Sequence, residues 1–322
     1  MFLFLGKRIL EISISLFILV TIVFFMFRLL PADPTAAMVD SALTPEAIQQ
    51  IQHNFGLDKP LYEQYLLYLK NIITKGDFGI SFFYRQPVIK ILADKIFNTV
   101  ILGITAIIFA YSLGIILGAL LAWYRGTRFE MIGIIISLFF KAAPQFWTGM
   151  IFLMIFSYCL GWFPSSGMRE IAYEASGIMK YLSLDFLHHL ILPTIVTGLY
   201  YLAQPMLLMR NTMLEIIHEP FIDLAFAKGL PLKRIIFQHA ARNALLPVTT
   251  TFATRMGQTV GGLVLVEYVF SWPGLGREIV MAATRYDYPL AQAAFILIAL
   301  VVMIFNIMAD LLYGLLDPRI VY

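Results

Sequence analysis

A buried charge is the first feature of this sequence that points to chemistry. Lys141 lies in a long apolar stretch, about ten residues from its end, which is roughly 15 Å at ~1.5 Å per helical residue. An ammonium group at that depth needs a cavity or a carboxylate partner. Two interpretations follow: Lys141 lines or gates a solute pathway, or it is tied to a carboxylate such as Asp310 or Glu267.

A polar stripe occurs in a second apolar stretch, on one face of the helix expected there. Its members are Thr251, Arg255, Gln258 and Thr259. Such a stripe faces protein or water rather than lipid. Together with Lys141 and Asp310 it is a candidate for lining a passage. The alternative is hydrogen bonding between helices, for which threonines are well suited.

Motifs of familiar catalytic chemistry are absent from the sequence. There is no Gly-x-x-x-x-Gly-Lys-Ser/Thr phosphate loop, no Gly-x-Ser-x-Gly elbow and no His-Glu-x-x-His pair. The single cysteine excludes an internal disulfide and supplies no metal framework. His188 and His189 are adjacent, point to different helix faces and have no third ligand, so we expect no metal site. If ATP drives this protein, a separate chain must bind it.

The main polar segment between apolar stretches extends from Glu219 to Pro247. Its pattern predicts two short helices, roughly 221–228 and 231–241. Gly229 separates them because glycine accepts the left-handed conformation that ends a helix, and Pro231 suits the first turn of the next. A basic cytoplasmic loop is the simplest interpretation. The length and internal amphipathicity of the segment favour a surface that a partner protein holds.

These residues resemble the coupling loop of ABC importer permeases of the dipeptide/oligopeptide/nickel branch. Ala225-Phe-Ala-Lys-Gly-Leu230 and His239-Ala-Ala-Arg-Asn-Ala-Leu-Leu-Pro247 match its A-x-A-K-G-L and H-x-x-x-N-A-L-L-P patterns. Asp223 and Leu224 depart from the general motif, which has Glu and Ala there. Further family motifs occur in order at 30–34, 76–81, 144–147, 267–276, 287–289 and 317–319.

The resemblance implies an all-α, polytopic membrane protein with six transmembrane helices and the MetI-like permease fold. It implies a permease subunit without its own ATPase site, which imports dipeptides, oligopeptides or related small solutes. Nickel, metallophore or glutathione import is the alternative; an exporter of the same family or a secondary transporter is a more distant one. The implied partners are a second homologous permease chain, two ATPase chains that use ATP and magnesium, and an extracytoplasmic solute-binding protein. We expect no cofactor on this chain and no nucleic acid partner.

The resemblance also assigns the residues that would contact the ATPase. Those of the first helix and the turn after it would form the contact, and those of the second helix would support it. They are Phe221, Asp223, Ala225, Lys228, Gly229 and Leu230, followed by Lys233, Arg234, His239 and Asn243.

The composition indicates a membrane protein. Hydrophobic residues make up 60% of the 322 residues and charged residues 13%, with a mean hydropathy of +0.81. A soluble chain could not cover its surface with so few charges. A net charge of +3 is too small to suggest nucleic acid. Stretches of about 20 apolar residues can cross a bilayer as helices, and six occur, at 9–28, 98–123, 131–158, 187–208, 244–267 and 290–313.

The distribution of basic residues in short loops places both termini in the cytoplasm, and the resemblance implies the inner membrane of a bacterium. Arg277 and Arg285 count against this orientation. We expect a first transmembrane helix at 1–30, an external helical insertion at 31–97 and a permease core at 98–322, with the coupling loop at 210–243. The insertion would hold one helix from Thr44 and another from Leu61 to Thr74. It either packs on the spans or meets the binding protein.

Overall fold

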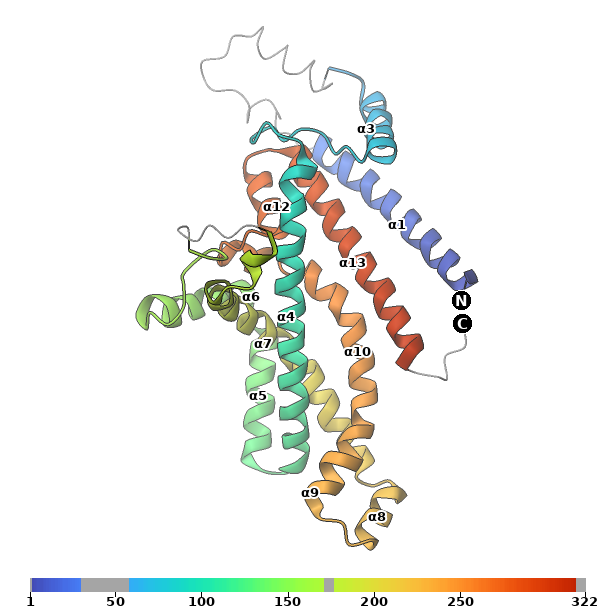
Figure 1. The fold of residues 1–322 in the computed structure, drawn as a ribbon, viewed down its shortest axis with the longest axis vertical. Helices are drawn as coiled ribbons and strands as arrows, with labels where there is room; N and C mark the ends of the chain where they lie inside the picture. Colours follow the sequence, from blue (N-terminus) through green and yellow to red (C-terminus); the bar gives the residue numbers. More distant parts are fainter. Residues whose placement is uncertain (1, 30–57, 171–176, 317–322) are drawn as a thin grey trace. The chain divides into compact units, whose positions relative to one another are not determined.

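The computed structural model describes residues 2–29, 58–170 and 177–316, and in these ranges the regular secondary structure is helical apart from one isolated bridge between Ile80 and Pro87 (Figure 1). The prediction of an all-α membrane protein is therefore confirmed. The long helices are α1 (Phe2–Arg28), α4 (Val88–Trp123), α7 (Leu184–Ile216) and α13 (Tyr288–Leu316). Within the described ranges these four helices are long and apolar enough to cross a membrane.

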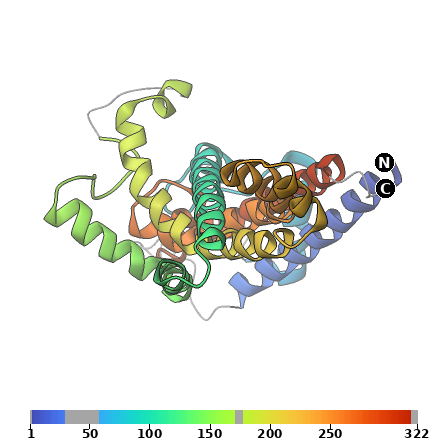
Figure 2. The same cartoon turned by 90° about the horizontal axis from the view of Figure 1, so that it is seen from below.

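The third expected span is not one helix. α5 (Arg128–Ala142) ends before Pro144, and α6 (Gln145–Phe152) continues into the π-helical η2 (Leu153–Cys159). The two parts are bent by 107°, and the turn is visible in Figure 2. A continuous helix over 131–158 was the wrong expectation, because a residue before proline avoids the helical conformation. Ala143 accordingly has ψ 138°.

The fifth expected span is shorter and begins earlier than the sequence predicts. α10 (Ala241–Gly261) is followed, after a break, by α11 (Val264–Val269). On its other side, α9 (Leu232–Arg234) and the π-helical η4 (Ile235–Ala240) run directly into α10. The second helix of the polar segment and the span after it are thus one continuous helical stretch. α10 does not reach the hydropathy of the four apolar helices because it carries the polar stripe.

Two compact units make up the fold. The first consists of Met1–Thr99 and Pro273–Met303 and includes α3 (Leu61–Lys75) and α12 (Leu275–Thr284). α3 confirms the helix expected from Leu61 to Thr74, and Gly76 ends it with φ 60°. The helix expected from Thr44 lies outside the described residues, as do the motifs at 30–34 and 317–319.

Inside the first unit, two sequence motifs that lie far apart in the chain meet. The buried carboxylate of Asp287 accepts hydrogen bonds from the hydroxyl of Ser81 and from the backbone N–H groups of Phe82 and Phe83, the latter two at 3.1 Å. Lys95 pairs with the buried Glu278 at 2.5 Å and so joins α4 to α12. The loop after α3 is therefore fastened to the start of α13.

The second unit consists of Val100–Trp272 and Ile304–Tyr322 and contains α5 to α11, with η3 at Gly177–Tyr181. Glycines let α4 and α7 approach closely here. A Cβ atom on Gly114 would come within 2.8 Å of the Pro205 ring, and one on Gly118 would meet the backbone oxygen of Met206. α7 also packs against α5 and α10, so it is the central helix of this unit.

Candidate functional site

The short helix α8 (Pro220–Ala227) is held to the second unit by its inner face. Ile222 is 0% exposed and Ala225 is 5% exposed. Both belong to one apolar cluster with residues of α7, η4 and the start of α10, among them Met209, Met213, Ile235, Ile236 and Ala244. Figure 1 shows α8 and α9 beyond the ends of α7 and α10.

Three large apolar side chains of α8 are uncovered, beside the exposed Asp223. Phe221, Leu224 and Phe226 are 41%, 55% and 50% exposed. Three large exposed apolar side chains on eight residues of helix indicate an interaction surface. We call these three residues the outer face of α8. Leu224 and Phe226 were not among the residues assigned from the sequence, although Leu224 follows Phe221 at helical spacing.

The other assigned contact residues divide by exposure. Ala225 points into the apolar cluster and does not lie on the outer face. Leu230 and His239 are partly buried. The remaining seven are exposed: Phe221, Asp223, Lys228, Gly229, Lys233, Arg234 and Asn243.

The turn after α8 depends on Gly229, as the sequence predicts. Gly229 has φ +67°, and a Cβ atom there would meet nothing within 4 Å, so the backbone conformation alone requires glycine. Its N–H donates to the carbonyl of Phe226 at 2.9 Å, and the N–H of Leu230 donates to that of Ala225 at 3.3 Å. This pair of bonds is the Schellman arrangement that closes a helix end.

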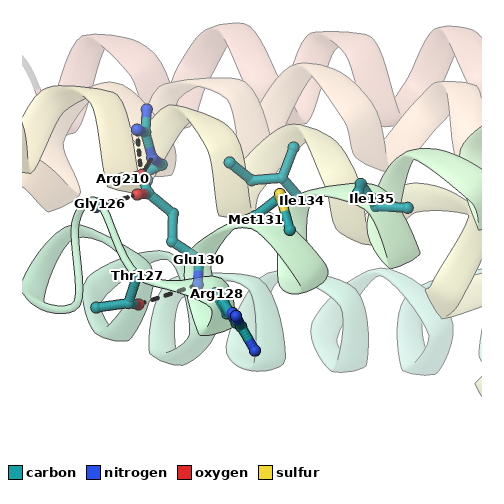
Figure 3. A pocket seen from close by; sticks show the side chains of 8 residues that line it. All are labelled: Gly126, Thr127, Arg128, Glu130, Met131, Ile134, Ile135 and Arg210. Atoms are coloured by element: carbon teal, nitrogen blue, oxygen red, sulfur yellow. Dashed lines mark hydrogen bonds and ion pairs between the residues drawn. The ribbon is translucent and has the colours of Figure 1, made fainter.

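An ion pair ties the start of α5 to α7 (Figure 3). The guanidinium of Arg210 donates to Glu130, with Nε 2.7 Å from Oε1, and the N–H of Gly126 donates to the other carboxylate oxygen at 2.6 Å. Thr127 caps the helix by accepting from the N–H of Glu130. The Thr-x-x-Glu spacing was the available sequence signal. A pocket of about 480 Å³ opens beside the pair, against Met131 and its neighbours on α5.

A second cavity, of about 250 Å³, brings together three of the residues predicted from the sequence. Lys141 comes from α5, whereas Arg255 and Gln258 come from α10. The expectation that Lys141 is buried was wrong for this chain, in which its side chain is exposed at the edge of the cavity. Arg255 donates to the side-chain oxygen of Gln258 at 2.5 Å. α7 completes the lining with three residues that the sequence analysis missed, Tyr200, Tyr201 and Gln204. Their polar tips within an apolar helix were the available signal.

The other residues of the predicted path do not line this cavity. Thr259 is fully buried and donates to the carbonyl of Arg255 at 2.9 Å, and Thr251 donates to that of Val248 at 2.9 Å. Asp310 lies on α13. Among the described residues, Lys141 forms no salt bridge with a carboxylate, so the tie to Asp310 or Glu267 does not occur there.

The fold and these sites define the class of the protein. It is an all-helical membrane protein with several spans, a polar cavity lined by three of its helices and an exposed apolar helix beyond their ends, which is the construction of a transport permease. Residues 114–322 match the family "Binding-protein-dependent transport system inner membrane component", and residues 1–103 match its N-terminal family. The chain belongs to this family. It is a multi-pass inner-membrane permease of a binding-protein-dependent ABC transporter, in a family that has no ATPase activity of its own.

Similar proteins agree with this assignment over nearly the whole chain. A di/tripeptide transport system permease protein of Pseudomonas aeruginosa is 36% identical over 330 aligned positions, 98% of each chain. A glutathione transport system permease protein of Escherichia coli is 32% identical over 316, again 98% of each. The solved inward-facing MetNI methionine ABC transporter has the same fold, with a TM-score of 0.56 at 16% identity, over 71% of this chain and 97% of that one.

Proposed function

We propose that this chain forms half of the translocation pathway of an importer for dipeptides or oligopeptides, and that α8 is the surface through which an ATPase drives it. One observation carries the coupling assignment. α8 is anchored by Ile222 and Ala225 but leaves Phe221, Leu224 and Phe226 uncovered. The similarity to a di/tripeptide permease supports the substrate class.

The coupling follows from how α8 is attached. It packs on η4, which continues into α10, and it shares one buried apolar cluster with Met209 and Met213 of α7. A push on α8 is therefore transmitted to two of the helices that line the cavity. ATP shifts the permease between inward- and outward-open states because it binds the closed ATPase dimer better than the open one.

The complete importer would contain a second, similar permease chain, two ATPase chains that use ATP and magnesium, and an external binding protein. In this arrangement both termini of the present chain are cytoplasmic. The exposed basic residues Lys228, Lys233 and Arg234 near α8 support that orientation, since short cytoplasmic loops are rich in lysine and arginine. Lys141, Arg255 and Gln258 would line part of the pathway.

Glutathione is the second candidate substrate because a glutathione permease is 32% identical to this chain. ATP-driven uptake into vesicles that contain the whole complex separates the two. Preferred uptake of dipeptides or longer peptides over glutathione supports the peptide assignment, and the reverse order of rates replaces it.

The coupling assignment is tested by purifying the chain from mild detergent with Gly229→Pro. Proline cannot adopt φ +67° and lacks the N–H that Gly229 donates to Phe226. We expect the natural chain to bring down a second permease and an ATPase, and the variant to lose the ATPase and uptake. Gly161→Pro is the matched control, because Gly161 also has a positive φ, +64°, and open space around it. ATPase retention by the Gly229 variant equal to that of the control would contradict the assignment.

A further inference from the structure

The cavity between α5, α7 and α10 has an uneven charge. Two of its lining side chains, Lys141 and Arg255, are cationic, and none of the lining residues is a carboxylate. The other four are neutral tyrosines and glutamines. Two positive charges without a lining carboxylate give the cavity a positive potential, which attracts anions and repels cations.

Lys141 and Arg255 both keep hydrogen-bond donors available for a ligand. Lys141 has no salt-bridge or hydrogen-bond partner within the described parts of the chain. Arg255 donates one Nη1 bond to the neutral Gln258, which leaves the rest of its planar fork available. A guanidinium fork next to an ammonium group matches a carboxylate, which accepts hydrogen bonds on two oxygens.

The volume decides how much of a solute can enter. About 250 Å³ is smaller than the roughly 300–1,000 Å³ of pockets that enclose whole drug-sized ligands. The cavity holds a small dipeptide or one end of a longer peptide, but not an entire oligopeptide. The tyrosine rings of Tyr200 and Tyr201 offer an apolar wall to the carbon atoms beside that end and a hydroxyl at the rim.

We propose that this cavity receives the C-terminal carboxylate of the peptide during translocation, with Lys141 and Arg255 as the groups that bind it and Gln258 as the residue that orients Arg255. The proposal rests on the importer function proposed above and adds the chemical group that the pathway recognises. A free divalent metal ion is disfavoured at the same place by two positive charges.

The test uses the purified complex without its binding protein, so that the preferences of the binding protein do not enter. Binding of alanyl-alanine and of its C-terminal amide is measured by saturation-transfer NMR. The natural complex should bind the acid at least about tenfold more tightly than the amide, since a charge-assisted hydrogen bond contributes roughly 1.5–3 kcal/mol. N-acetylated alanyl-alanine, which keeps the carboxylate, should bind like the acid.

Single substitutions then show which side chains bind the carboxylate. Lys141→Met and, separately, Arg255→Gln should each reduce the acid-to-amide preference severalfold, whereas Lys141→Arg should keep most of it. Lys7→Met is the matched control, because Lys7 is an exposed lysine of α1 with no salt-bridge partner among the described residues, and it should leave the preference unchanged. If one cavity variant does not assemble, the other makes the same prediction independently.

Equal affinity of the natural complex for acid and amide, or no detectable binding of the acid at millimolar concentration, overturns the proposal. An unchanged preference in both Lys141→Met and Arg255→Gln does so as well. Each of these results is compatible with ATP-driven peptide uptake by the complete system, so uptake measured in parallel shows whether the importer function itself stands.

Discussion

Two substitutions on opposite faces of α8 separate anchoring from docking. Ile222→Ala removes a side chain that is 0% exposed, inside the cluster that holds α8 to α7. A buried isoleucine cut to alanine costs about 2–5 kcal/mol. Leu224→Ala removes a side chain of the same size that is 55% exposed. We expect that loss to change the stability of the free chain by less than about 1 kcal/mol.

For the affinity of the ATPase, the exposed Leu224 makes the direct contribution instead. A leucine that becomes buried on binding contributes about 1.5–3 kcal/mol, which corresponds to roughly a 10- to 150-fold loss of affinity in Leu224→Ala. Ile222→Ala should also lose ATPase, but through displacement of α8. Hydrogen exchange of the α8 and η4 amides in the chain purified alone distinguishes the two causes. Exchange should accelerate in Ile222→Ala and stay at its natural rate in Leu224→Ala.

The reasoning is refuted if Leu224→Ala retains the ATPase with natural affinity. It is equally refuted if the α8 amides of Leu224→Ala exchange as fast as those of Ile222→Ala. Either result would mean that the outer face of α8 is not a contact surface but a part of the fold.

Two ties in the structure give further predictions. Glu130→Gln leaves Arg210 without its carboxylate, and the side chains of Glu130 and Arg210 are only 10% and 21% exposed. We therefore expect the free energy of unfolding, measured by thermal unfolding, to fall by about 2–3 kcal/mol and to be partly restored by adding Arg210→Met. Full stability of the single variant would show that the pair does not stabilise the fold. Asp287→Asn replaces a carboxylate oxygen that accepts from Ser81, Phe82 and Phe83 by an NH₂ group. Limited proteolysis should therefore cut the loop after α3 at least about tenfold faster. Unchanged cleavage would mean that other contacts hold the loop.

The residue types made the end of α8 predictable from the sequence. They did not predict which side of α8 is buried. The residue types of Gly229 and Pro231 alone predict that one helix ends and the next begins here. Ala225 lies at helical spacing both from Phe221 and from Ile222, and an alanine is small enough for either environment. Only the tertiary structure, in which α8 packs on η4 and joins the buried cluster, decides that Ala225 faces inward.

The effect of proline likewise depends on tertiary structure. Pro193 and Pro205 lie inside the continuous helix α7, but Pro144 separates α5 from α6 with a bend of 107°. The residue type is the same in all three places, so the sequence does not distinguish a tolerated proline from a break. The lining of the cavity likewise cannot be predicted from the sequence alone. Lys141 stands out by itself, but its meeting with Tyr200 depends on how two helices pack.

The proposed docking surface and the cavity are linked by the same two helices. α7 carries Met213 in the buried cluster that includes α8 and Gln204 in the cavity, nine residues apart in one helix, or about 14 Å at ~1.5 Å per residue. α10 carries Arg255 in the cavity and is reached from the α8 side through η4. The Glu130–Arg210 pair adds the start of α5 to this group. If an ATPase acts on α8 as proposed, we expect its load to reach all three helices that line the cavity and the cavity to move with them as one body.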